Sequence, residues 1–134
     1  MLEFCIVIFW SKTMKSHWTE HKGKRVFIAE YSNFGTDTAS LFTESSEILQ
    51  VITKEEPNSV LIASNLDGTV ATPANLEVFK NTLPISNHFI KKRAAVGLTG
   101  IRRTFLDIIN KLTGNSTYRA FDRLEDALDW LVEE

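Results

Sequence analysis

Residues 60–63 read VLIA, four apolar side chains in succession with no polar residue between them. A strand with one solvated face alternates apolar and polar residues, whereas a strand covered on both faces does not. The run therefore predicts a buried strand of a parallel sheet. Residues 94–98, AAVGL, predict a second buried strand, because their small side chains allow a helix to pack closely.

A helical pattern precedes the first of these strands, over residues 37–53. Thr36 or Asp37 can cap its start with a side-chain oxygen. The positions that fall on one helical stripe are Leu41, Phe42, Ser45, Ile48, Leu49 and Ile52. We expect this stripe to face the sheet.

Two more helices follow farther along the chain. The first starts at Thr72-Pro73, with proline at the first helical position, and we expect Pro84 to end it. Its buried face consists of Leu76, Phe79 and Leu83. The next helix ends at Gly114, and its stripe consists of Ile101, Phe105, Ile108, Ile109 and Leu112.

The two ends of the domain carry simpler signals. Residues 16–21, SHWTEH, and 25–32, RVFIAEYS, flank a three-residue turn at 22–24 and predict a β-hairpin. Residues 118–121 predict a short strand near an edge of the sheet. A last helix begins at a capping box of Asp122 and Glu125, and its apolar face consists of Leu124, Leu128 and Leu131.

The resulting order of elements is β-β-α-β-α-β-α-β-α. Alternating strands and helices predict an α/β fold with a mostly parallel sheet of about five strands. An N-terminal antiparallel hairpin strand lies at its edge, and four helices complete the fold. We expect one domain over residues 16–134.

The N-terminus does not fit this pattern. Residues 1–10, MLEFCIVIFW, are nearly all apolar but make up half the length of a membrane-spanning helix. Residues 1–13 are therefore either an extra strand or docking segment, or a translated extension ahead of a natural start at Met14. We favour the extension, because ordinary domain patterning begins only after Met14.

Composition excludes several classes of protein. The 134 residues include 15 basic and 17 acidic side chains, so the chain is not a uniformly basic nucleic-acid binder. The single cysteine, Cys5, excludes an internal disulfide and any zinc site that needs two thiolates. His17 and His21 could share one strand face, but surface histidines without a metal explain them better. We expect no metal, no cofactor and no integral membrane segment.

Three stretches resemble the STAS-like family related to the bacterial anti-sigma-factor antagonist SpoIIAA. They are HKGKRVFIAEYSN at 21–33, RAAVGLTGIRR at 93–103 and FDRLEDALDWLVEE at 121–134. The resemblance implies a cytoplasmic domain without catalytic activity that acts as a partner-binding switch. In the neighbouring CRAL-TRIO group it implies a carrier of apolar ligands. Phosphorylatable antagonists carry an Asp-Ser-Ser-Gly-like segment, whereas residues 66–76 here read LDGTVATPANL.

The carboxyl ends of parallel strands meet at one edge of a sheet, where functional residues gather. The candidate partner or anion surface at this edge consists of Asn65, Asp67, Thr72, Thr99, Gly100, Arg102 and Arg103. Thr72 could carry a phosphate at a helix N-terminus, but an ordinary N-cap is the better explanation. Arg102 and Arg103 either converge on an anion or lie solvated beyond a glycine turn.

A carrier would instead hold its small apolar or anionic ligand between the helices and the sheet. The side chains that could line such a cavity are Phe34, Phe42, Phe79 and Phe105. Core packing is the alternative explanation for all four. The leading hypothesis is a protein partner, with a small-ligand carrier as the second.

Overall fold

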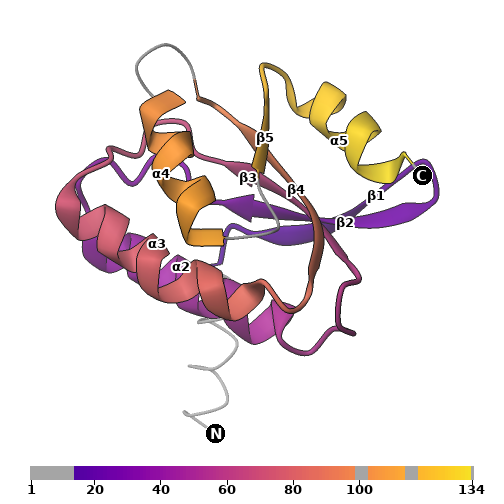
Figure 1. Ribbon diagram of the computed structural model, residues 1–134, viewed down its shortest axis with the longest axis horizontal. Helices are drawn as coiled ribbons and strands as arrows, with labels where there is room; N and C mark the ends of the chain where they lie inside the picture. The colour runs from indigo at the N-terminus through magenta and orange to yellow at the C-terminus, as the bar shows by residue number, and fades with distance from the viewer. Residues whose placement is uncertain (1–13, 99–102, 114–117, 134) are drawn as a thin grey trace, which may run out of the picture.

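Strands and helices alternate along the part of the chain that the computed structural model describes, residues 14–98, 103–113 and 118–133 (Figure 1). The strands are β1 (His17–His21), β2 (Lys24–Glu30), β3 (Val60–Asn65), β4 (Ile90–Val96) and β5 (Tyr118–Phe121). The helices are α2 (Thr38–Ile52), α3 (Pro73–Ser86), α4 (Arg103–Thr113) and α5 (Leu124–Val132). This order confirms the predicted α/β class.

The five strands form one sheet in the order β1-β2-β3-β4-β5. β1 pairs with β2 antiparallel, and the later neighbours pair in parallel. Because each parallel strand is added on the same side of its predecessor, right-handed crossovers put the connecting helices on one face. Figure 1 shows α2, α3 and α4 on that face and α5 on the other.

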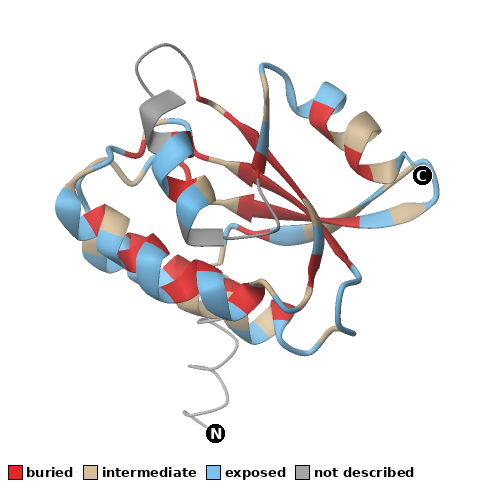
Figure 2. Ribbon diagram, in the orientation of Figure 1, coloured by how far each residue is buried: buried red, intermediate tan, exposed pale blue. Residues whose placement is uncertain are grey.

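The core therefore has two parts, one on each face of the sheet (Figure 2). Within the VLIA run, Val60 and Ile62 belong to the part under α2, α3 and α4, whereas Leu61 and Ala63 face α5. Strand side chains alternate between the two faces. The absence of polar residues from the run follows directly, since both faces are covered by helices.

The hairpin turn is shorter than the sequence predicts. His21 pairs directly with Lys24, so the turn contains Lys22 and Gly23 alone. Their φ angles are 51° and 83°, which is the left-handed pair of a type I′ turn. This turn matches the twist of the flanking strands, and Lys24 becomes the first residue of β2.

Two predicted helix boundaries are wrong. Pro84 lies inside α3, because a proline near the end of a helix removes only one backbone bond and its φ is already helical. α5 has Arg123 as its N-cap, without a side-chain hydrogen bond. A capping box would require Asp122 to be the N-cap, with the helix beginning one residue earlier, at Arg123.

The strand predicted at 94–98 starts four residues earlier, at Ile90, and ends at Val96. It includes a basic segment that hydropathy places outside a buried strand. The Lys92 ammonium donates to the Trp130 carbonyl oxygen at 2.6 Å, near the C-terminus of α5, and lies 4.4 Å from the centroid of the Trp130 ring. Arg93 is buried in the core.

The predicted helical stripes hold in their centres and fail at single positions. Phe42 and Ile108 are exposed, while Leu41 and Ile109, next to them in sequence, are buried. Leu124 is also exposed, whereas Leu131 of the same predicted stripe is buried. Helical spacing leaves room for two neighbouring faces, and the width of the packed face decides which residues are covered. Ile101 and the side chains of Phe105 and Leu112 lie outside the described residues.

Candidate functional site

Two loops run side by side beyond the carboxyl ends of β2 and β3. We call residues 32–37 and 66–72 the loop pair. The Asn33 amide donates to the Asp67 carbonyl at 2.7 Å, and the Gly35 amide donates to the Gly68 carbonyl at 2.8 Å. The Val70 amide donates back to the Gly35 carbonyl at 3.0 Å. The sheet hydrogen bonding thus continues into the loops and fixes them to one another.

Two buried polar side chains hold the loop pair from beneath. The Thr69 hydroxyl donates to the Tyr31 carbonyl at 2.6 Å and accepts from the Phe34 amide at 3.1 Å. Asn75, in the first turn of α3, is fully buried. Its Nδ2 donates to the carbonyl oxygens of Gly35 at 3.1 Å and Val70 at 2.7 Å.

Each loop ends in a capped helix. The Thr72 hydroxyl accepts from the Asn75 amide at 3.1 Å, with Pro73 at the first helical position, so the N-cap prediction is confirmed. The Asp37 carboxylate accepts from the Ser40 amide at 3.2 Å and the Ser40 hydroxyl at 2.7 Å. These two hydrogen bonds lower the pKa of Asp37.

The predicted residues Asn65 and Asp67 lie together but differ in role. Asn65 is half-buried, and its Nδ2 donates to Glu30 Oε1 at 3.1 Å while its Oδ1 accepts from the Asp67 amide at 3.1 Å. Its amide therefore joins the ends of β2 and β3. The Asp67 side chain is exposed and available to a partner.

A buried carboxylate that the sequence analysis missed supports the same edge. Glu44 Oε2 accepts from the Ser16 amide at 2.8 Å and the Ser16 hydroxyl at 2.6 Å. The Ser16 hydroxyl in turn accepts from the Glu30 amide at 2.9 Å. Its position in the sequence could have indicated its burial, because Glu44 lies on the helical stripe between Leu41 and Ile48.

The chain passes close to the same loops directly after the end of β4. Gly97 has φ +83°, and a Cβ there would lie 2.6 Å from the Asp67 nitrogen and 2.9 Å from Asn65 Oδ1. Both the positive φ and the close approach exclude a larger residue.

Replacing Gly97 with alanine is therefore expected to lower the free energy of unfolding by about 2 kcal/mol. Gly23 is a matched control, because its φ is also +83° but no atom lies within 4 Å of a Cβ built on it. Gly23→Ala should cost about 1 kcal/mol, from the backbone conformation alone. Urea unfolding of both variants measures the difference, and equal losses would contradict the close approach at Gly97.

The structure describes only part of the predicted site. Thr99, Gly100 and Arg102 lie outside the described residues, as does the side chain of Arg103. The hypothesis that the two arginines converge on an anion stays a prediction.

The candidate cavity phenylalanines whose side chains the structure describes differ in burial. Phe79 is buried, with its ring 5.1 Å from the Tyr31 ring between centroids, and Phe42 is 54 % exposed. Phe34 is half-buried, with the Lys15 ammonium 4.1 Å from its ring centroid. The side chain of Phe105 lies outside the described residues. The carrier hypothesis also stays a prediction.

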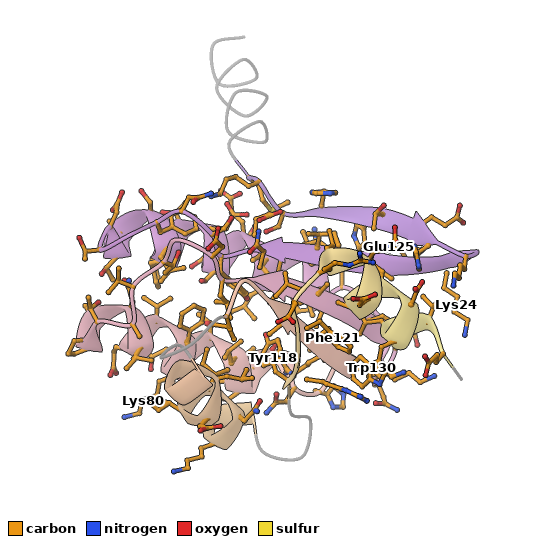
Figure 3. The ribbon with its side chains drawn as sticks, turned by 90° about the horizontal axis from the view of Figure 1, so that it is seen from above. Lys24, Lys80, Tyr118, Phe121, Glu125 and Trp130 are labelled. Carbon is orange, nitrogen blue, oxygen red and sulfur yellow. The ribbon has the colours of Figure 1, made fainter. Side chains whose placement is uncertain are left out.

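A groove of about 750 Å³ lies at the opposite edge of the sheet, between the hairpin, β4 and the end of α5. Basic side chains line it, but several of them support the fold. Lys24 Nζ donates to the Val132 carbonyl at 3.1 Å, and Figure 3 shows Lys24 at the hairpin beside α5. Arg25 lies 3.3 Å from Glu55 and stacks over Trp18 at 3.9 Å. We therefore assign this groove a structural role.

Residues 14–98, 103–113 and 118–133 contain no group of three or more histidine, cysteine, aspartate or glutamate side chains able to hold a metal ion. The described helices include none long and apolar enough to cross a membrane. His21 Nε2 lies 2.7 Å from Asp129 Oδ1, and this polar contact joins β1 to α5.

Comparison with known proteins identifies the fold. No family model and no curated protein matches the sequence. A crystal structure from Shewanella loihica, of an uncharacterised protein of the DUF3478 family with a SpoIIAA-like fold, matches with a TM-score of 0.63. The match covers 87 % of this chain and 91 % of that one at 13 % sequence identity. The fold of this chain is therefore SpoIIAA-like, as the resemblance in its sequence predicted.

Proposed function

We propose that this chain is a non-catalytic STAS-like domain that binds a protein partner through the loop pair. The observation that carries the proposal is the fixation of the two loops by backbone bonds and by Asn75. Loops that are already ordered lose little conformational entropy on binding, so more of the contact free energy appears as affinity.

The exposed side chains of the loop pair indicate what kind of partner would fit. Asp37 and Asp67 present exposed carboxylates, and Val70, in the same loop as Asp67, is 47 % exposed. A small apolar contact with a polar surround is the usual composition of a protein interface. We include Thr99, Gly100, Arg102 and Arg103 in the proposed contact region. A partner with an apolar pocket, basic groups facing Asp37 and Asp67, and acidic groups facing Arg102 and Arg103 would complement this surface.

The SpoIIAA-like fold supports a regulatory role, and we propose that the protein acts in the bacterial cytoplasm. Fold likeness is an argument by analogy, since one fold can serve many functions. The loop pair is therefore the part of the proposal that experiment should test first.

Asp67→Lys is expected to reduce recovery of the partner at least fivefold in a pull-down with tagged protein from the native cell. Glu56→Lys is the matched control, because Glu56 is also exposed but lies in the connection between α2 and β3, at the opposite edge of the sheet. It changes the charge equally and should leave recovery unchanged.

Equal recovery with wild-type protein and Asp67→Lys would contradict the proposal. The double variant Arg102→Glu/Arg103→Glu tests the rest of the proposed surface, and we expect a comparable loss. Native mass spectrometry of the purified protein distinguishes the carrier hypothesis, since a co-purifying small molecule would favour it.

A further inference from the structure

Arg93 is a buried cation in the middle of the sheet. It pairs with Ile62 of β3 on one side and Tyr118 of β5 on the other, and it is 1 % exposed. The arginine thus lies in the layer between the sheet and the helices α2 and α3, where a charge loses its hydration.

The described partners of Arg93 are all neutral. Its Nη2 donates to the Ser86 hydroxyl at 3.3 Å and to the Asn87 side-chain oxygen. The guanidinium carbon lies 5.4 Å from the centroid of the Tyr118 ring. Among the described residues no carboxylate forms a salt bridge with Arg93, although buried charges in proteins are normally paired.

Neither Glu44 nor Tyr31 supplies a negative charge to Arg93. The Glu44 carboxylate instead accepts hydrogen bonds from the backbone amides of Lys15 and Ser16 and from the Ser16 hydroxyl. Tyr31 lines the same cavity as Arg93, but burial, reinforced by Tyr118, raises the pKa of its phenol far above its ordinary value. Tyr31 therefore stays neutral at physiological pH.

Two residues that line a small cavity in this layer each carry an unpartnered buried polar atom. Arg93 Nε and the Ser45 hydroxyl are buried, and neither has a hydrogen-bond partner within the described residues. Both residues line a cavity of about 10 Å³ between α2, α3 and the sheet. This volume is about that of one solvent-sized occupant.

The chemistry of these groups selects the occupant. Arg93 Nε can only donate, and the Ser45 hydroxyl is free to donate. A cavity with two free donors and an unpaired positive charge favours an acceptor with negative charge over a neutral one. The volume excludes phosphate and carboxylate ligands.

We propose that this cavity binds a single chloride-sized halide ion, held by Arg93 Nε and the Ser45 hydroxyl. The ion would compensate the buried guanidinium and stabilise the packing of α2 and α3 on the sheet. This site is separate from the loop pair, so the proposal does not depend on the proposed function.

Chloride titration of thermal and urea unfolding tests the proposal in solution, at constant ionic strength with methanesulfonate, which is too large for the cavity. Binding to the folded state alone should raise the folding equilibrium constant with a saturable concentration dependence, about 100-fold at a chloride concentration 100 times Kd. Arg93→Met should abolish this response. Arg119→Met, which removes an exposed arginine from the neighbouring strand, should retain it.

Crystals of the wild-type protein grown in sodium bromide provide a measurement that no variant can compromise. We expect an anomalous bromine peak in contact with Arg93 Nε and Ser45 Oγ, and Ser45→Ala should weaken the chloride response in solution. A water molecule without anomalous signal at this position would overturn the proposal. An equal chloride response in wild-type protein and Arg93→Met would overturn it as well.

Discussion

Phe79→Ala is expected to lower the free energy of unfolding by about 4 kcal/mol. The Phe79 ring is 1 % exposed and meets the Tyr31 ring edge to face at an interplanar angle of 77°. Truncation would remove the buried area of the ring and leave a cavity between α3 and the sheet. Urea unfolding followed by tryptophan fluorescence measures the loss.

Phe42→Ala is the matched control, because both residues were candidates for lining a ligand cavity and the same atoms are removed. Phe42 is 54 % exposed on α2, so its truncation should change stability by less than about 0.5 kcal/mol. If Phe79 faced a ligand cavity rather than the packed core, its truncation would also be nearly neutral. Similar stabilities of the two variants would contradict the core assignment.

Asn75→Ala is expected to cost about 3 kcal/mol and to release the loop pair. The substitution removes the donor to the Gly35 and Val70 carbonyl oxygens and the acceptor of the Thr38 hydroxyl, at 2.6 Å. Buried groups that lose their partners suffer the full cost of desolvation. Amide hydrogen exchange of residues 32–37 and 66–72 should accelerate more than that of β3.

Asn81→Ala provides the control on the same helix, since Asn81 is exposed. Its stability should stay within about 0.5 kcal/mol of wild type, with unchanged exchange in the loops. If Asn75→Ala accelerated exchange uniformly across the protein, the amide would support global stability alone. The role assigned to it in ordering the loop pair would then be wrong.

Much of the fold follows from local sequence patterns. The VLIA run predicted a strand covered on both faces, and Val60 and Leu61 face opposite helix layers. The caps at Asp37 and Thr72 were also predictable, because a capping side chain bonds an amide only two or three residues away. Interactions of such short range depend little on the rest of the chain.

Local patterns were less reliable where packing competes with them. Pro84 remains helical because α3 continues along the sheet for two more residues, and Lys22 takes up a positive φ to close a two-residue turn. In both cases the lost local preference is smaller than the gain from packing or strand pairing.

The site could be predicted only in part, for a related reason. Asn65 and Asp67 were predicted because they follow a recognisable buried strand. Asn75, Glu44 and Arg93 were not, since a polar residue in an isolated sequence is expected to be exposed. Their importance depends on partners distant along the chain, as in the bond between Glu44 and Ser16, 28 residues apart.

The sequence by itself thus determined the order of strands and helices, because periodicity and caps act over one or two turns of chain. The tertiary structure alone decided that two loops form one surface and that Arg93 lies in the core without a carboxylate partner among the described residues. Both features arise from neighbours that meet only when parallel strands align. The physical reason is that desolvation and hydrogen bonding depend on the whole surroundings of a group, which a linear sequence does not specify.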